Sequence, residues 1–335
     1  KLTADWYLKN TRDLLLQATI PASSGYTSAM LNIGSMQNQG FEVTLDLVPV
    51  QKQNFTWNMN FNIALNRNKV TALTNDQYSL LRSVSWDQRF NAQYPYITQV
   101  GKPSGMMYGF IYEGTYKPDE FNGGTSLKDG IPYMTSVGQE KVKPGDPKYR
   151  DINADGLIDD NDRTIIGCGQ PLHTGGFGNT FNFYGFDLNI FFSWSYGNDV
   201  INVNRLYFEN GSITNTNQLK TYTNRWSEKN PTSDIPRVGA DIASMFVYSS
   251  RVVEDASFLR LRNVTLGYTF PRKLLRKMHF DTMRLYVSGE NLWTLTNYSG
   301  PDPEVSTRNS VLTPGFDWSA YPRAMGVTAG LSFTF

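Results

Sequence analysis

Apolar and polar residues alternate with a period of two along three stretches of the chain. Because successive side chains of a β-strand point to opposite faces, this pattern predicts strands with one apolar and one polar face. The same alternation occurs in 186–195, where only Phe191 interrupts the polar face, and in 325–335, which stops on Phe335. In 55–66 the apolar face consists of Phe55, Trp57, Met59, Phe61, Ile63 and Leu65.

The length of these stretches distinguishes between two all-β architectures. Strands of soluble sandwiches have about five or six residues, whereas a strand that crosses a bilayer at a tilt needs about ten. The three stretches have the greater length, and no run of about 18 apolar residues predicts a membrane-spanning helix. The sequence therefore predicts an all-β fold, a transmembrane antiparallel β-barrel with long extracellular loops.

About ten strands are expected, and the connections between them orient the chain. They lie near 3–15, 39–48, 54–66, 78–90, 104–117, 176–184, 186–196, 256–270, 282–291 and 324–335. If the first strand runs outward, the shorter connections are periplasmic, namely 49–53, 91–103, 185 and 271–281. The longer segments are then extracellular, namely 16–38, 67–77, 118–175, 197–255 and 292–323. Both termini become periplasmic, provided that the weakly patterned 78–90 is a strand.

Two local irregularities have structural interpretations. The alternation changes phase near Arg262 and Asn263, which predicts a β-bulge. A glycine-rich stretch does not follow a strand and open a helix, so it is expected to lead from a tight turn into a strand rather than to bind phosphate. Its glycines are Gly175, Gly176 and Gly178.

Composition and charge exclude several classes of function. The 335 residues include 31 Lys and Arg against 30 Asp and Glu, with no basic run, so nucleic acid is not an expected partner. Cys168 is the single cysteine, which excludes an internal disulfide framework and a cysteine-built zinc site. His173 and His279 have no partner at a recognised catalytic spacing, so no enzyme activity is expected. Residues 1–7 show no export signal, and the start of an exported protein would therefore be missing.

The segment 151–162, DINADGLIDDND, has the ligand spacing of an EF-hand-type calcium loop. Gly156 stands at the position of the sharp turn, and Ile158 at the position that packs inward. Position twelve is an Asp rather than the usual Glu, and the alternative is an Asp/Asn-rich turn without metal. The expected Ca²⁺ ligands are Asp151, Asn153, Asp155, the carbonyl of Leu157, Asp159 and Asp162.

Several segments in order resemble the SusC/RagA family of TonB-dependent outer-membrane transporters. They are NQGFEVTLDL (38–47), FTWNMNFNIALNRNKVTAL (55–73), VGKPSGMMYGFIYEGTY (100–116), KPGDPKYRDINADGLIDDNDRTIIG (143–167), FGNTFNFYGFDLNIFFSWSYGNDVIN (177–202), FLRLRNVTLGYTFP (258–271), LYVSGENLWTLTNYSGPDPEVS (285–306) and GLSFTF (330–335).

The resemblance implies a barrel of about 22 strands with a plug inside. Residues 1–335 would be its C-terminal part, without the signal peptide, plug domain and TonB box. It also implies TonB-dependent import of oligosaccharides or peptides, with a SusD-like surface lipoprotein and energy from TonB, ExbB and ExbD. A terminal aromatic residue with apolar residues in phase resembles the signal read by the barrel assembly machinery. The residues concerned are Phe335, Phe333 and Leu331.

Two other functions share parts of the pattern. A passive outer-membrane porin would have the same wall without plug or energy coupling. A secreted β-sandwich that binds glycans would use aromatic and acidic loop residues instead. The expected location is the Gram-negative outer membrane, with lipid against the apolar face.

Overall fold

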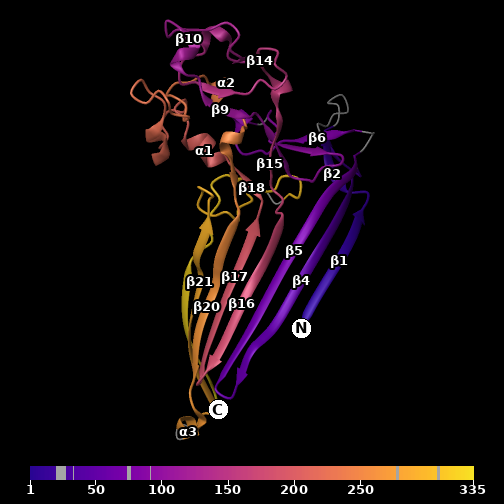
Figure 1. The fold of residues 1–335 in the computed structure, drawn as a ribbon, viewed down its shortest axis with the longest axis vertical. Coiled ribbons are helices and arrows are strands. Elements are labelled where there is room, and N and C mark those ends of the chain that lie inside the picture. The colour runs from indigo at the N-terminus through magenta and orange to yellow at the C-terminus, as the bar shows by residue number, and fades with distance from the viewer. Residues whose placement is uncertain (20–27, 33, 74–76, 91, 277–278, 308–309) are drawn as a thin grey trace.

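The computed structural model describes residues 1–19, 28–32, 34–73, 77–90, 92–276, 279–307 and 310–335. Its main feature is an antiparallel sheet of eight strands in the order β1-β4-β5-β16-β17-β20-β21-β23. The sheet is a single long layer, and most of the other elements gather at one end of it (Figure 1). Its strands are β1 (Leu2–Thr11), β4 (Gly34–Lys52), β5 (Phe55–Leu73), β16 (His173–Phe183), β17 (Phe186–Tyr196), β20 (Phe258–Thr269), β21 (Thr282–Thr296) and β23 (Gly326–Thr334).

The register of the sheet places the apolar residues of neighbouring strands on the same face. Phe177 of β16 lies opposite both Phe61 of β5 and Phe192 of β17, and directly paired residues share a face. The face is open to the surroundings: Leu266 and Leu285 are 46% and 48% exposed. The alternation predicted for 55–66, 186–195 and 325–335 is therefore confirmed.

Two features of the faces explain residues that break the pattern. Asn179 lies on the apolar face, but it is buried and its Oδ1 accepts a hydrogen bond from Trp57 Nε1 at 3.0 Å. Phe191 lies on the polar face opposite Gly178, and a Cβ on Gly176 would come within 2.9 Å of the Phe191 ring. The glycines thus lie within β16, where they make room for an aromatic ring.

The predicted bulge near Arg262 and Asn263 is confirmed. The register of β20 shifts between Leu261 and Asn263 against β21, and its pairing with β17 shifts at the same place. Arg262 is the extra residue, and its Nε donates to Ser193 Oγ at 2.8 Å. The bulge therefore aims a charged side chain at the polar face.

Two of the ten expected wall strands are wrong. The stretches 78–90 and 104–117 do not join the eight-stranded sheet but contribute to small sheets at its end. There β6 (Ser79–Arg82), β7 (Tyr96–Gln99), β8 (Met106–Gly109) and β15 (Thr164–Cys168) form one sheet in the order β15-β8-β7-β6, and β9 (Tyr112–Thr115) pairs with β13 (Pro147–Tyr149). The connection 91–103 consequently lies with the small sheets and not at the end that was expected to be periplasmic. The two stretches were expected to be consecutive wall strands of opposite direction. Removing both from the wall therefore leaves the expected direction of every other wall strand unchanged.

The shorter connections lie at the end opposite the small sheets. β16 and β17 are joined by Tyr184 and Gly185, whose φ angles of 49° and 90° suit a two-residue hairpin turn. β4 and β5 are joined by 53–54, and α3 (Arg272–Leu275) lies between β20 and β21. β1 runs away from this end and β23 returns to it (Figure 1). Parts of the expected outer segments 16–38 and 67–77 lie outside the described residues.

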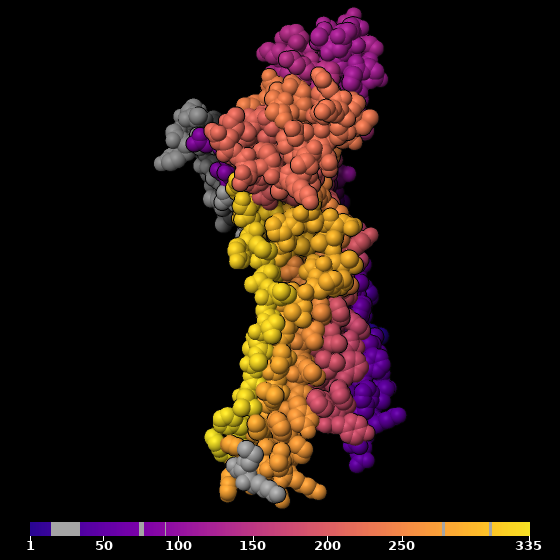
Figure 2. All heavy atoms as spheres, turned by 90° about the vertical axis from the view of Figure 1, so that its left-hand side faces the viewer, coloured from indigo at the N-terminus to yellow at the C-terminus, as the bar shows by residue number. Residues whose placement is uncertain are grey.

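We call the described parts of 77–172, 197–257 and 297–325 the cap. Figure 2 shows the cap as a broad head on the narrow column of the sheet. Its further strands are β10 (Phe121–Asn122), β11 (Ser126–Leu127), β12 (Tyr133–Met134), β13 (Pro147–Tyr149), β14 (Leu157–Ile158), β15 (Thr164–Cys168), β18 (Asp199–Asn202), β19 (Val253–Asp255) and β22 (Phe316–Asp317). Its α-helices are α1 (Val203–Phe208) and α2 (Ile242–Met245). Beside the wall, β2 (Leu15–Thr19) pairs with β3 (Ser28–Asn32). No helix in the described part of the chain is long and apolar enough to span a membrane.

Candidate functional site

The described part of the cap contains three apolar clusters, and the two larger ones, named here the inner and the outer cluster, concern the site. The inner cluster, next to the wall, surrounds β18 and α1, and the outer cluster lies under β10 and β14 (Figure 1). The inner cluster includes Phe90, Tyr96, Met107, Val203 and Phe316. The outer cluster includes Phe110, Tyr116, Phe121, Met134 and Ile158. The cap is therefore a folded unit with its own cores.

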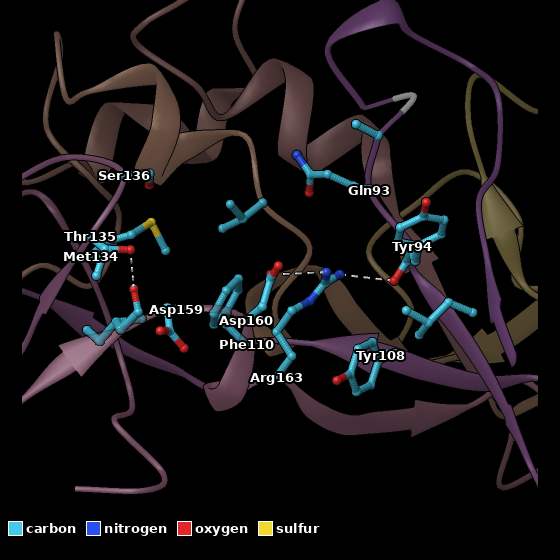
Figure 3. Close-up of a pocket in the computed structure, with 14 residues that line it drawn as sticks. Gln93, Tyr94, Tyr108, Phe110, Met134, Thr135, Ser136, Asp159, Asp160 and Arg163 are labelled. Atoms are coloured by element: carbon cyan, nitrogen blue, oxygen red, sulfur yellow. Dashed lines mark hydrogen bonds and ion pairs between the residues drawn. The ribbon is translucent and has the colours of Figure 1, made fainter. Parts of the chain in front are cut away.

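A cavity of about 580 Å³ lies beside the outer cluster (Figure 3). This volume is within the range of pockets that take small ligands. Its apolar floor comes from the outer cluster and its neighbour Val247, and its polar rim comes from four separate segments. The floor is Phe110, Met134, Ile158 and Val247, and the other lining residues include Gln93, Tyr94, Tyr108, Thr135, Ser136, Asp159, Asp160 and Arg163.

Arg163 is the cationic residue of this cavity, and its side chain is only 9% exposed. Its Nη2 donates a hydrogen bond to the carbonyl oxygen of Tyr94 at 3.0 Å. The guanidinium carbon lies over the ring of Tyr108 at 5.0 Å and over that of Phe110 at 5.8 Å. Its Nε is buried and makes no hydrogen bond within the described residues. The aromatic rings and the Tyr94 carbonyl thus fix a largely desolvated cation at the cavity wall.

The carboxylate that approaches Arg163 is poorly suited to neutralise it. Asp160 Oδ1 lies 3.5 Å from Arg163 Nη1, and the Asp160 side chain is 91% exposed. A long, solvated contact of this kind contributes little. Figure 3 shows the guanidinium between Asp160 and Tyr94, with its end groups towards the cavity.

Asp151–Asp162 precedes this arginine and is ordered by its own carboxylates. Asp151 accepts hydrogen bonds from the N–H groups of Ala154 at 2.7 Å and Gly156 at 2.8 Å. Gly156 has φ +85°, the left-handed conformation that its position in the turn requires. At the other end, Asp162 accepts from the N–H groups of Ile152 at 2.7 Å and Asp159 at 2.9 Å. The two end carboxylates therefore close the loop through backbone donors.

The side chain of Ile158 packs inward, as the sequence predicts. The geometry of the loop does not by itself show a Ca²⁺ site. Ile158 is fully buried in the outer cluster and pairs with Met134. Asn153 and Asp155 hydrogen-bond each other at 2.8 Å, and the carbonyl of Leu157 lies in β14. Within the described residues, no group of three or more His, Cys, Asp or Glu could hold a metal ion. Calcium stays a prediction. The loop continues into the turn Asp160–Asp162, which fixes Asp160 and Arg163 at the cavity.

Of the residues expected to form an assembly signal, two lie on the apolar face of β23 and Phe335 follows directly after that strand. Phe335, Leu331 and Phe333 are 81%, 53% and 49% exposed. The rings of Phe333 and Phe335 lie 5.5 and 5.6 Å from that of Phe280. This grouping forms an aromatic cluster at the end opposite the cap, and its role in assembly stays a prediction.

Sequence reasoning did not identify the cavity. Tyr108 and Phe110 belong to a stretch assigned to the wall, and Arg163 appeared only within a longer resembling segment. Tyr96, Ile97 and Thr98 are buried in the cap, whereas the sequence placed them in a connection between two strands, and their burial follows from the fold rather than from a pattern in the sequence. His173 was expected to have an ordinary polar role: its Nδ1 accepts a hydrogen bond from Trp194 Nε1 at 3.1 Å.

Comparison with known proteins gives the chain its relatives. No family model matches it. It is 34% identical over 340 residues to TonB-dependent receptor P3 of Formosa agariphila, covering 100% of this chain and 32% of that protein. It is 28% identical to TonB-dependent receptor SusC of Bacteroides thetaiotaomicron, covering 99% of this chain and 30% of that one.

Solved structures show the same fold. A structure described as the RagAB peptide transporter matches 100% of this chain and 33% of its own, with a TM-score of 0.79 and 24% identity. The match confirms the transmembrane β-barrel class predicted from the sequence. The chain spans about a third of the length of the curated relatives it matches.

Proposed function

We propose, starting from the homology of the whole chain to TonB-dependent receptors of the SusC type, that residues 1–335 form the C-terminal part of the wall of such a receptor together with its cap. The observation that supports this most directly is the single-layer sheet with an exposed apolar face. A soluble sandwich would bury that face against a second sheet. Lipid on one side and an aqueous lumen on the other satisfy both faces. The proposed location is the outer membrane of a Gram-negative bacterium.

The activity we propose is TonB-dependent import of oligosaccharides or peptides with a SusD-like surface lipoprotein. The names of the relatives support energy-dependent uptake, and the matching RagAB structure is described as a peptide transporter. Because the chain spans about a third of its relatives, coupling to TonB, ExbB and ExbD would use parts of the receptor outside residues 1–335. The described residues would contribute wall, cap and substrate contacts, and no bond would be broken.

The free edges of the sheet fit this assignment. Among the described residues, β1 and β23 stand at the two ends of the strand order, so each has one edge paired and one edge without a partner strand there. An unpaired edge within a bilayer is costly, because lipid cannot replace its hydrogen bonds. We propose that the remaining strands of a barrel of about 22 complete both edges. The barrel assembly machinery would read Leu331, Phe333 and Phe335 before closure.

Uptake by cells that contain the intact receptor tests this function. Labelled oligosaccharides and peptides should accumulate only while the proton gradient is maintained, because energy enters through TonB. Entry that continues at the same rate after the gradient is collapsed would instead indicate a passive porin. Solubility of the intact protein without detergent would contradict the membrane location itself.

A structural Ca²⁺ in 151–162 is a separate proposal, supported by the ligand spacing and by the turn at Gly156. Replacing Asp151 and Asp155 together by Ala should remove a bound ion and lower the melting temperature of the cap. The matched control is Asp129→Ala, an exposed carboxylate outside the loop. Elemental analysis of the wild-type receptor that finds no calcium would reject the ion. A smaller stability loss would then remain, from the lost N–H acceptors.

A further inference from the structure

We propose that the cavity around Arg163 is a binding site for a carboxylate that sits next to an apolar group, as at the C-terminus of a peptide that ends in a leucine-like residue. The inference adds a ligand chemistry and a set of residues to the proposed import function, on which its biological meaning rests. Its test measures binding rather than uptake, so the two can fail separately.

The first support is the state of Arg163. The side chain is nine-tenths buried, and the Tyr94 carbonyl and the Tyr108 ring hold the guanidinium at the cavity wall. Its contact with Asp160 is 3.5 Å long and involves a carboxylate that is almost fully solvated. Burial of a cation is costly unless a close anion compensates it. A ligand carboxylate can approach at a normal hydrogen-bond distance and exclude water from the pair, which Asp160 does not do.

The second support is the floor, which selects the neighbour of that carboxylate. Phe110, Met134 and Ile158 are buried members of the outer cluster, and Val247 packs against them. The accessible apolar surface beside the cation comes from the half-buried Val247 and from Leu81, which also lines the cavity and is 39% exposed. A branched apolar side chain placed there would gain from removal of its surface from water.

The same geometry disfavours a sugar at this position. Carbohydrate rings stack on free aromatic faces, but the guanidinium of Arg163 already covers the Tyr108 ring, which leaves Tyr94, 39% exposed, as the open aromatic ring of the lining. Phe110 is 7% exposed and offers little open surface. A uronate would supply the carboxylate without an apolar group for the floor. The cavity therefore favours an amphiphilic acid over a sugar acid.

The carboxylates of Asp159 and Asp160 at the rim repel any bound anion, and they differ in exposure to solvent. Asp159 accepts the N–H of Asn161 at 2.8 Å, which compensates part of its charge. Asp160 is free to move because its side chain is 91% exposed. Entry of a ligand carboxylate would displace Asp160 into solvent. Asp160 thus competes with the ligand for Arg163.

Calorimetric titration of the purified intact receptor in detergent tests the proposal with defined probes. N-acetyl-alanyl-leucine should bind more tightly than its C-terminal amide by about tenfold, the factor expected for one charge-assisted pair. Galacturonate should bind no better than galactose. Equal binding of the acid and the amide would overturn the carboxylate assignment. Arg163-dependent binding of galacturonate that is tighter than that of the peptide would overturn the apolar neighbour.

Variants separate the site from general effects on folding. Arg163→Met should abolish the preference for the acid over the amide, whereas Arg150→Met, at an exposed arginine outside the cavity, should preserve it. Ser136→Trp fills the cavity from its exposed rim and should weaken binding even if Arg163→Met folds poorly. Asp160→Asn should raise the affinity for the acid a few-fold and leave that for the amide unchanged. Retention of the acid preference in Arg163→Met, or unchanged binding in Ser136→Trp, would overturn the site.

Discussion

The wall and the cap are parts of one chain that fold by different means. In the wall, each strand gains a complete hydrogen-bonded neighbour, and its apolar side chains remain exposed to what surrounds the sheet. In the cap, strands of two to five residues form small sheets around buried clusters. The wall therefore depends on its surroundings for burial, whereas the cap supplies its own. This difference explains why period-two alternation identifies the strands of the wall and gives no guide to those of the cap.

The cap also differs from the wall in that it buries charged side chains. The cap buries ionic groups in pairs: Glu209 is 1% exposed and contacts both Arg205 and Arg251. One such pair joins the regions, since Arg260 of β20 lies 2.5 Å from Asp302 of the cap and both are buried. The contact ties the wall to the segment that follows β21.

Breaking this junction should give the largest effect on stability. Arg260→Met leaves Asp302 buried without its cation, and loss of one partner of a buried pair costs about 3–5 kcal/mol. Arg150→Met removes an exposed pair with Glu113 and should cost about 0–1 kcal/mol. Urea unfolding of the intact receptor measures both. Equal losses in the two variants would show that wall and cap are not coupled through Asp302.

The pH dependence of the same pair follows from Asp302. Burial opposes ionisation of its carboxyl, but hydrogen bonds from Arg260 and from the N–H groups of Arg323 and Glu304 outweigh this and lower the pKa of Asp302. A carboxyl with a lowered pKa stabilises the fold above its unfolded pKa of about 3.9 and loses this contribution as pH falls through the folded value. Wild type should therefore lose more stability than Arg260→Met in strongly acidic solution.

Introducing an arginine on one or the other face of the wall tests what surrounds each face. The expected loss of stability is somewhat smaller than that at the junction. Ile190 lies on the apolar face of β17 and Asn189 on the polar face. Ile190→Arg should destabilise the barrel by about 2–4 kcal/mol in a bilayer, because the charge would face lipid. Asn189→Arg should cost much less, since its side chain would face the lumen. The measurement is unfolding of receptor reconstituted in lipid vesicles, and equal costs would contradict a lipid-facing side.

The extent of correct prediction follows this division. The faces of β5, β17 and β23 and the bulge at Arg262 could be read from the sequence, because one-sided burial imposes a period of two. The stretches 78–90 and 104–117 were placed in the wall because strand length and spacing alone do not tell a wall strand from a cap strand.

The candidate site could not be predicted from the sequence, for a related reason. Its residues come from segments as distant as Tyr94, Thr135 and Arg163, and no local pattern reports their approach. The acidic loop before Arg163 was recognised by its spacing, and its internal hydrogen bonds agree with an ordered turn. What spacing could not reveal is that this turn delivers an arginine to a cavity.

The smallest effect on stability is expected at the last strand, where the question is assembly rather than burial. Phe335 is 81% exposed and contacts Phe280, while Thr334 lies on the other face of β23. If the assembly machinery reads the terminal aromatic, Phe335→Ala should lower the amount of folded receptor in the membrane several-fold without changing synthesis. Thr334→Ala should not. Once assembled, the Phe335→Ala barrel should unfold within about 1 kcal/mol of wild type, because an exposed ring adds little to packing. Normal membrane levels of Phe335→Ala would mean that the apolar face of β23 is explained by lipid contact alone.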